Sequence, residues 1–403
     1  MELVEELKAR LVRQIDLSRD LSDEDLSAII NNMVLEEYRA KGVPLKEKLR
    51  ISRELFHAIR GMDIMQEILE DEDVTEIMVN RFDRIFVEKK GKLFRYEGSF
   101  SSPEKLRDVI QMIVSKTNKR VNEADPIVDT RLPDGSRVNV VLPPVSIRGP
   151  VVTIRKFSKK AMTMEDLIGI GSITQEAAVF LKKRVEEGYN LFISGGTGSG
   201  KTTFLNALAG FIPKDERIIT IEDSAELKID RIENLVSLEC RPANVEGENE
   251  ITIRDLIRTA LRMRPTRIIV GEVRGEETLD MLQAMNTGHD GSLSTGHGNS
   301  PSDMLSRLET MVLMGCEMPL PAIRAQIASA LDIMVHLGRM RDGSRKVLEI
   351  AEIAGFEEGT IHLNPLFYFH AKDGGEGCLK ATGNRLKHRK TGIWGGKIED
   401  VFG

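Results

Sequence analysis

The fold is decided by residues 190–211, which read NLFISGGTGSGKTTFLNALAGF. From Gly195 to Thr202 this stretch matches GxxxxGK[ST], the motif of phosphate-binding loops, without a mismatch. A short apolar segment precedes the motif and a segment with helical spacing of apolar residues follows it, which is the strand, loop and helix setting of such loops. The stretch therefore predicts a nucleotide site. A glycine-rich turn that binds nothing is the weaker alternative, because both the motif and its setting match.

The residue types of this loop indicate how it would hold a nucleotide. Its glycines let backbone N–H groups converge on phosphate oxygens, and the dipole of the following helix adds partial positive charge at the same point. Lys201 is expected to reach the β- and γ-phosphates, and the Thr202 hydroxyl to complete the shell of a Mg²⁺ ion. The predicted cofactors are therefore ATP and Mg²⁺. The predicted loop contacts are Gly195, Gly196, Thr197, Gly198, Ser199, Gly200, Lys201, Thr202 and Thr203.

An acidic group follows the next predicted strand. ITIEDSAEL, at 219–227, places Glu222, Asp223 and Glu226 at the end of that strand. In a doubly wound sheet the carboxyl ends of the strands border the ligand crevice. These acids are therefore candidates to bind Mg²⁺ through water or to orient the attacking water, although a solvated loop would also be acidic.

A second apolar strand ends in an acid. RIIVGE, at 267–272, resembles a Walker B strand, in which Glu272 would align the attacking water or take its proton. Gly271 occupies the position at which many such strands carry a magnesium-binding aspartate. One acid after one strand is a weak signal alone, and the phosphate loop strengthens it.

Two histidines lie in the glycine- and serine-rich segment TGHDGSLSTGHGNSP, at 287–301. A histidine beside the γ-phosphate can donate a hydrogen bond and report hydrolysis to the next segment. His289 and His297 could instead be ordinary loop residues, or form a metal site with Asp290. Two histidines with no nearby cysteine or third histidine have poor spacing for zinc.

Arginines recur in two places. One set repeats every four residues on a predicted helix, opposite an apolar stripe, and the other set lies in extended segments. Such arginines usually face solvent, but in a ring of subunits an arginine can reach a neighbour's nucleotide and accelerate phosphoryl transfer. Spacing leaves both alternatives open. The helical set is Arg254, Arg258 and Arg262, and the extended set is Arg131, Arg137 and Arg155.

The spacing of apolar residues and the residue composition change along the chain, which predicts several domains. Residues 1–50 have helical spacing, and residues 51–157 combine short strands with one helix, as in a small α+β domain. Residues 158–173 have weak periodicity and are predicted to be a linker. Residues 174–372 alternate strands and helices, which predicts a mostly parallel sheet covered by helices. Residues 373–403 are rich in glycine and lysine and are predicted to be a tail.

Composition excludes several classes of protein. The 403 residues are 41% hydrophobic and 30% charged, as in globular proteins rather than collagen-like or disordered chains. The net charge of −6 argues against a nucleic-acid partner. The N-terminal segment has no apolar core of a secretory signal, and no stretch approaches the roughly 18 apolar residues of a membrane span, so a cytoplasmic location is expected. The three cysteines show no CxxC spacing, which disfavours disulfides and zinc.

These motifs, in this order and with these separations, resemble the secretion ATPase family that drives type II and type IV secretion and type IV pili. The likeness is greatest to the CpaF-like branch, which serves tight-adherence (Flp-type) pili, and it covers roughly residues 50–370. The segments that carry it are EIMVNRFDRIFVEKKGKL, RLPDGSRVNVVLPP, GPVVTIRKF, the phosphate loop, ITIEDSAEL, RPTRIIVGEVRG and STGHGNSPSDMLSRLETM.

The resemblance implies a hexameric ring in which each protomer has a RecA-like ATPase domain, a smaller N-terminal α+β domain and a helical extension, with ATP held between the two domains. It implies that Glu272 is the Walker B catalytic acid, that His297 is the His-box histidine, and that residues 222–226 are the Asp box. Within the Asp box Glu226 is favoured for the metal-bound water, followed by Glu222. The arginines it assigns to the nucleotide are Arg137 and Arg155 of the N-terminal domain and Arg254, Arg258 and Arg262 before Walker B.

Two positions depart from the family pattern. Gly298 stands where alanine is expected, and Arg81-Phe82 stands where Gly-Pro is expected. Neither change removes a chemical group, so both concern the local backbone.

The implied function is Mg²⁺-dependent ATP hydrolysis by a motor that acts on a membrane platform protein of a pilus or secretion system. With no predicted membrane span, the protein is expected to bind the cytoplasmic face of the membrane through a partner. The alternatives are a RecA-like nucleic-acid motor and a nucleotide-gated scaffold that does not hydrolyse ATP. An ABC-type transporter ATPase is disfavoured, because no LSGGQ-like segment separates the phosphate loop from RIIVGE.

Overall fold

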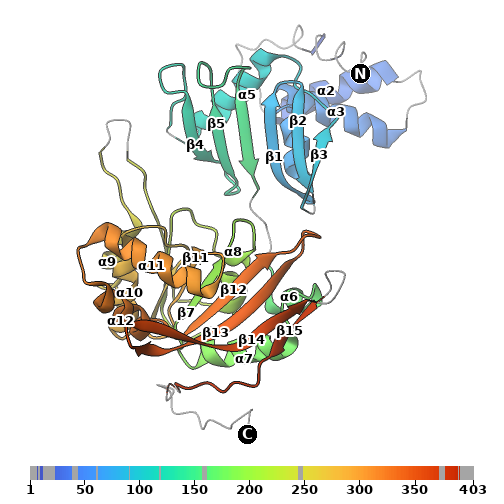
Figure 1. Cartoon of the computed structure of the whole chain (residues 1–403). Coiled ribbons are helices and arrows are strands. Elements are labelled where there is room, and N and C mark those ends of the chain that lie inside the picture. Colours follow the sequence, from blue (N-terminus) through green and yellow to red (C-terminus); the bar gives the residue numbers. More distant parts are fainter. Residues whose placement is uncertain are drawn as a thin grey trace. The chain divides into compact units, whose positions relative to one another are not determined.

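The structure is a computed structural model in which the chain divides into two compact units, Met1–Lys159 and Lys160–Gly403 (Figure 1). Each unit has its own hydrophobic core. None of the described helices combines the length and the apolar character that crossing a membrane requires. The described residues are 7, 10–11, 23–38, 44–59, 62–89, 91–117, 119–156, 161–243, 248–371, 377–388 and 390.

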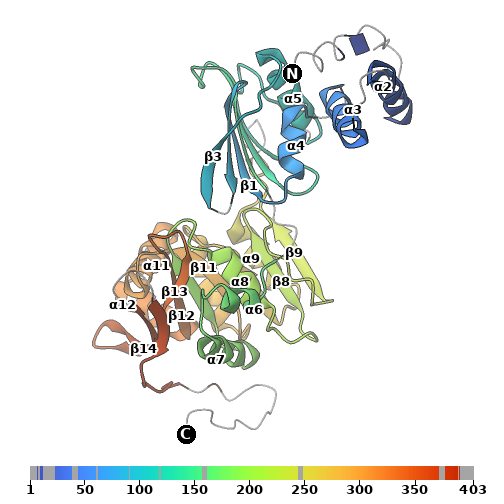
Figure 2. The same cartoon turned by 90° about the vertical axis from the view of Figure 1, so that its right-hand side faces the viewer.

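The first unit is built on an antiparallel sheet of six strands in the order β3-β2-β1-β6-β5-β4. Because successive side chains of a strand point to opposite faces, one face buries alternate residues such as Ile77 and Val79. Helices α4 (Ile64–Glu70) and α5 (Pro103–Ser115) cover that face (Figure 2). The strands are β1 (Val74–Arg81), β2 (Arg84–Lys89), β3 (Lys92–Tyr96), β4 (Ile127–Arg131), β5 (Arg137–Val141) and β6 (Val151–Arg155).

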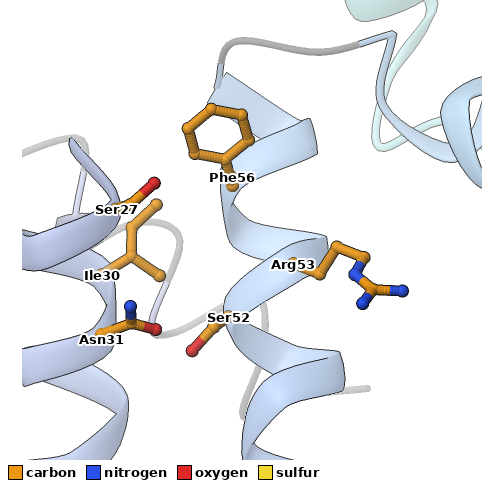
Figure 3. Close-up of a pocket in the computed structure, with 6 residues that line it drawn as sticks. All are labelled: Ser27, Ile30, Asn31, Ser52, Arg53 and Phe56. Carbon is orange, nitrogen blue, oxygen red and sulfur yellow. The ribbon is translucent and has the colours of Figure 1, made fainter. Parts of the chain in front are cut away.

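Two helices, α2 (Asp23–Tyr38) and α3 (Leu45–Ile59), precede this sheet and share a separate core, in which Leu7 and Leu11 are also buried. The predicted domain boundary at residue 50 falls inside α3, because the buried face of that helix continues beyond it. A cavity of about 200 Å³ lies between the two helices. Figure 3 shows its lining, which is Ser27, Ile30 and Asn31 of α2 and Ser52, Arg53 and Phe56 of α3.

The second unit contains a nine-stranded sheet in the order β15-β14-β13-β12-β7-β11-β10-β8-β9. The neighbours in the run β12-β7-β11-β10-β8-β9 pair in parallel. The neighbours in the run β15-β14-β13-β12 pair antiparallel. The strands are β7 (Leu191–Gly195), β8 (Ile218–Glu222), β9 (Leu235–Glu239), β10 (Arg267–Val270), β11 (Leu293–His297), β12 (Ile333–Arg339), β13 (Arg345–Glu357), β14 (Thr360–Ala371) and β15 (Gly377–Ala381).

Helices cover both faces of this sheet. Residues of the first helices in the unit join the core on one face, and residues of the later helices join the core on the other. The central strands β7, β8 and β10 are consequently buried along their whole length, as is typical of parallel sheets. This confirms the α/β fold predicted from the alternation. The helices are α6 (Met164–Gly169), α7 (Gln175–Glu186), α8 (Lys201–Ala209), α9 (Ile253–Ala260), α10 (Glu277–Asn286), α11 (Pro301–Gly315) and α12 (Leu320–Ala330).

Two segments are more ordered than the sequence predicts. Within the predicted linker, 158–173, helix α6 starts with a capping box at Thr163, and its residue Leu167 is buried in the core of the second unit. Within the predicted tail, β15 pairs with β14, and the buried Glu352 carboxylate accepts hydrogen bonds from the backbone N–H groups of residues 387 and 388. A six-residue helix and a five-residue strand are too short for periodicity to reveal, and distant partners hold them in place.

Candidate active site

The phosphate loop turns from the buried strand β7 into helix α8. Gly198 and Gly200 have φ angles of 69° and 93°, in the left-handed region that glycine adopts at low cost. Gly195 is required for space, because a Cβ atom there would lie 2.6 Å from the Leu337 carbonyl oxygen and 2.6 Å from the Ser199 hydroxyl. The loop therefore delivers the chain to the N-terminus of α8, where N–H groups and the helix dipole favour an anion.

Lys201 is almost buried and points back along the loop. Its Nζ donates to the carbonyl oxygens of Gly195 and Gly196 at 3.1 Å each, and it lies 3.2 Å from Nδ1 of His297. Burial lowers the pKa of Lys201, and the Glu272 carboxylate opposes that shift. The ammonium group is thus held at the mouth of the loop by neutral acceptors that a phosphate could replace.

His297 joins this lysine to the predicted catalytic acid. Its Nε2 lies 2.8 Å from Oε1 of Glu272. Burial is the largest cause that lowers the pKa of His297, and the positive charge of Lys201 lowers it further. In the neutral ring Nδ1 can accept from the Lys201 ammonium, whereas the buried Oε1 of Glu272 lies near Nε2 and has no hydrogen-bond partner among the described residues.

Arg274 completes the cluster and is a residue that the sequence analysis missed. It donates to Oε2 of Glu272 from Nη2 at 2.7 Å and from Nε at 3.1 Å, and its Nη1 lies 3.6 Å from Asp223. The hydrogen bond to Glu272 raises the pKa of Arg274. The sequence could have indicated Arg274 by its position two residues after Glu272, within the family segment RPTRIIVGEVRG. We call Lys201, Glu272, Arg274 and His297 the rim cluster.

Glu222 lies at the end of β8 and is buried, with 4% exposure. Its Oε1 accepts hydrogen bonds from the backbone N–H of Glu226 at 2.8 Å and of Leu227 at 3.1 Å, so it shapes the turn that carries Glu226. A Cβ atom on Gly271 would lie 2.9 Å from Cγ of Glu222. The Glu222 side chain occupies the space that a side chain at position 271 would need. An aspartate at this position would therefore clash with Glu222.

Asn206, on the helix after the phosphate loop, contacts the same turn. Its side-chain oxygen accepts from the Lys228 backbone N–H at 2.8 Å. The half-buried Glu226 is thus held near α8, on which Thr202 and Thr203 lie in the first turn. Asn206 therefore links the turn that follows Glu226 to helix α8, and the role of Glu226 toward the nucleotide stays a prediction.

The helical arginines have partners of a different kind. Arg254 Nε and Arg258 Nε donate to the two oxygens of Asp280 on α10 at 2.9 Å each, and Arg254 also donates to Glu276 at 2.6 Å. We call these four residues the α9–α10 cluster. Arg262 follows the end of α9 and is exposed. Among the described residues, the hydrogen bonds of Arg254 and Arg258 join α9 to α10 rather than to the phosphate loop, and the nucleotide role of the three arginines stays a prediction.

The extended arginines lie in the first unit, in one row across neighbouring strands. Arg131 of β4 is opposite Arg137 of β5, and Arg137 is opposite Arg155 of β6. Arg155 Nε lies 3.9 Å from a Glu76 carboxylate oxygen on β1. The three guanidiniums are thus neighbours on one sheet, and their role toward a nucleotide stays a prediction.

Two residues from the C-terminal strands also approach the phosphate loop, and no local signal identified them. Arg345 of β13 donates from Nε to the Gly198 carbonyl oxygen at 2.9 Å. His336 of β12 lies 2.9 Å, through Nδ1, from the hydroxyl of Ser194, the residue before Gly195. Both are about 140 residues from the loop in sequence, so only the sheet pairing brings them there.

Comparisons with known proteins identify the family of this chain. Residues 60–384 match the family model of the "Type II/IV secretion system protein". Conjugal transfer protein TrbB of Rhizobium radiobacter is 33% identical over 292 residues, which cover 72% of this chain and 86% of that protein. Type IV secretion system protein PtlH of Bordetella pertussis is 33% identical over 308 residues, which cover 70% of this chain and 91% of that protein.

A solved structure shares the fold. The crystal structure of the pilus retraction motor PilT with bound ADP has a TM-score of 0.55 at 22% identity, and the match covers 71% of this chain and 81% of that chain. The family match spans the phosphate loop, both acidic strand ends and His297. The chain therefore belongs to the type II/IV secretion system protein family and is an ATPase.

Proposed function

We propose that this ATPase is a Mg²⁺-dependent motor that works as a homohexameric ring and powers pilus assembly or protein secretion across a cell envelope. The observation that carries the proposal is the rim cluster, in which Lys201 of the phosphate loop is joined through His297 to the carboxylate of Glu272. A protein that only binds nucleotide has no need for an acid and a neutral histidine at this point.

The chemistry of the rim cluster follows from its charges. The loop N–H groups and Lys201 would neutralise the phosphates, and Glu272 would orient the attacking water. A γ-phosphate that draws Lys201 and His297 toward itself removes the partners that these residues have in the free enzyme. His297 then exchanges its contact with Oε1 of Glu272 for one with the phosphate, so Oε1 can hold water while Arg274 keeps Oε2.

The residues present fit a magnesium ion that is bound together with the nucleotide. Among the described residues no group of three or more His, Cys, Asp or Glu side chains is arranged to hold a metal. Mg²⁺ held through phosphates and water needs only one hydroxyl or carboxylate from the protein, and Thr202 and Glu226 would supply these. When bound, the ion would spread the charge of the phosphates.

The remaining arginines support a ring. Arg137 and Arg155 of the first unit are opposite one another on neighbouring strands, and we assign them to the phosphates of the nucleotide because they match the arginines that the family resemblance implies. The exposed guanidiniums of Arg258 and Arg262 would face a neighbouring subunit. A nucleotide that touches both units would change their angle on hydrolysis, which is a hinge movement, and a ring of such hinges is a motor.

The family supports the proposed partner and place of action. Relatives are named for conjugal transfer and for type IV secretion, and a solved structure with this fold is a pilus retraction motor. For this chain we propose a membrane platform protein as partner, recruitment to the cytoplasmic face of the membrane, and service in a tight-adherence (Flp-type) pilus of the CpaF-like branch. A stable nucleic-acid partner is not part of the proposal, since the net charge is −6.

The test is steady-state phosphate release with ATP and Mg²⁺, with the oligomeric mass measured in the same samples. The wild-type chain should hydrolyse ATP as a large oligomer, and Lys201→Ala and Glu272→Gln should abolish turnover. Lys214→Ala and Glu233→Gln, at exposed positions outside the site, are matched controls that should retain activity.

Three outcomes would contradict the proposal. Nucleotide binding without turnover in any assembly state would favour the nucleotide-gated scaffold. Turnover that rises steeply with added polynucleotide would favour a nucleic-acid motor. Full turnover by a monomer, with no dependence on protein concentration, would exclude the ring as the active form.

A further inference from the structure

The hairpin of β12 and β13 extends beyond the strand that carries the phosphate loop. Strand β7 ends at Gly195, which is level with Leu337 on β12. The hairpin continues past this level by two further residue pairs, the last of which joins Arg339 to Arg345. Because neighbouring strands lie about 5 Å apart, a long side chain at this end of β13 can reach the loop that leaves β7.

Arg345, the first residue of β13, is the side chain that reaches the loop. Its Nε donates to the Gly198 carbonyl oxygen at 2.9 Å. A Cβ atom on Gly200 would lie 3.3 Å from Cδ of Arg345, so the same side chain also lies against Gly200. Arg345 therefore contacts the loop at the two glycines whose φ angles are positive.

The hydrogen bond to Gly198 fixes the direction of one peptide group. The carbonyl and the N–H of a trans peptide point in opposite directions, so a Gly198 carbonyl turned toward Arg345 turns the Ser199 N–H away from it. That N–H points back into the loop, where it donates to the Gly196 carbonyl oxygen at 3.3 Å. Phosphate loops bind an anion by directing successive N–H groups inward, and Arg345 holds one of these groups in that orientation.

The backbone of Arg345 is itself held from two sides. Its carbonyl oxygen accepts from the hydroxyl of Ser172 at 2.7 Å, and the Val347 N–H donates to the Ser172 carbonyl oxygen at 2.8 Å. Ser172 is 5% exposed and lies between α6 and α7. In the hairpin turn, Oδ1 of Asp342 accepts from the N–H of Ser344 at 2.9 Å and from its hydroxyl at 2.7 Å. A flexible arginine can position a loop only from a fixed backbone, and these bonds fix it.

We infer that Arg345 is a positioning residue for nucleotide binding, whose Nε holds the Gly198 carbonyl outward and so keeps the Ser199 N–H directed at the place of a phosphate. The inference rests on ATP binding at the phosphate loop, which belongs to the ATPase activity of the family, and it requires neither the ring nor a pilus. A loop ordered before the nucleotide arrives loses less binding free energy to ordering, so removal of this bond should weaken binding.

Two substitutions of equal length separate the hydrogen bond from the charge. In Arg345→Gln the amide nitrogen takes the place of Nε and can still donate to Gly198, whereas Arg345→Met places a methyl group there, and both remove the charge. We expect Arg345→Met to raise the Kd of a fluorescent ATP analogue by about 3- to 10-fold, and Arg345→Gln to stay within about twofold of wild type. Arg341→Met removes the same charge from an exposed position in the same hairpin and should leave the Kd unchanged.

Two results of this binding measurement would overturn the inference. Equal weakening in Arg345→Gln and Arg345→Met would mean that the charge, rather than the hydrogen bond, serves the nucleotide. A wild-type Kd in Arg345→Met would mean that the loop is ordered without this residue. Thermal unfolding of both variants is the control for a role that is only structural, which would weaken binding in step with the loss of stability and not according to the presence of the donor.

The Ser172→Ala variant tests the anchor of Arg345. It should raise the Kd by about twofold, and it should add nothing in an Arg345→Met background, because the anchor acts on the loop through the Arg345 side chain. Independent, additive effects of the two substitutions would overturn the anchoring role of Ser172.

Amide hydrogen exchange of the nucleotide-free chain gives a readout that does not need activity. Residues 196–200 should exchange faster in Arg345→Met than in Arg345→Gln, and equal exchange would also overturn the inference. A wild-type chain that binds the ATP analogue without hydrolysing ATP would instead refute the motor, and the binding and exchange comparisons would still decide the role of Arg345.

Discussion

The rim cluster and the α9–α10 cluster are built from the same kinds of side chain and differ in what surrounds them. In the rim cluster Glu272 lies at the end of a buried strand and shares its two oxygens between Arg274 and His297. In the α9–α10 cluster Asp280 shares its oxygens between two arginines on a neighbouring helix. The first cluster also holds Lys201 of the phosphate loop and a histidine with a lowered pKa. Location at the strand ends, rather than pairing itself, distinguishes a reactive cluster from one that joins helices.

The largest effect should come from Glu272→Gln, which keeps the shape of the side chain and removes its charge. We expect kcat to fall by about 10²- to 10⁴-fold, because the residue that orients or deprotonates water is lost, while ATP still binds. Phosphate release and equilibrium binding of a fluorescent ATP analogue measure the two effects separately. An activity near that of the exposed control Glu233→Gln would show that the Glu272 carboxylate does not serve the reaction.

Asp280→Asn tests the other cluster by its effect on stability. This residue is 7% exposed and neutralises two guanidiniums, so we expect the free energy of unfolding to fall by about 1–3 kcal/mol. The nucleotide affinity of the dilute chain should be unchanged. Urea unfolding followed by circular dichroism checks the first effect, and a stability as high as wild type would mean that the cluster contributes little to holding α9 on α10.

Gly271→Ala tests the packing of the rim. The new Cβ would lie 2.9 Å from Cγ of Glu222, whose carboxylate is held by two backbone N–H groups and cannot move aside cheaply. We expect a loss of about 1–3 kcal/mol in the free energy of unfolding and a lower kcat. Gly169→Ala is the control, because nothing lies within 4 Å of a Cβ atom there. Equal stability of the two variants would show that Glu222 is not confined.

The smallest effect should be the pH dependence of turnover. The pKa of His297 is lowered from its usual 6.5, first by burial and then by the charges of Lys201, Arg274 and Arg307, against the opposing Glu272. The ring is therefore neutral at pH 7. Turnover and folding stability that depend on the neutral ring should be lost only as the pH falls below 6.5. The acid limb of the kcat profile should flatten in His297→Gln. A wild-type limb that begins above pH 7 would contradict this assignment.

The sequence predicted the strand, loop and helix around Lys201, because the residues of this motif are contiguous and each residue type has a specific role in binding phosphate. It also predicted the parallel sheet and the acids that follow β8 and β10, since apolar runs and their end residues are visible in one dimension. It did not reveal helix α6 or strand β15, which are too short to show periodicity and are held by contacts with distant residues.

The sequence by itself determined the α/β fold, the phosphate loop, and Glu272 and His297 as candidates beside it. Only the tertiary structure decided the rest. It paired Glu272 with Arg274, gave Arg254 and Arg258 partners on α10, and placed His336 and Arg345 beside a loop about 140 residues earlier in the chain. The reason is physical: a motif records which groups a ligand needs nearby in sequence, whereas sheet order and register decide which distant side chains share its surroundings.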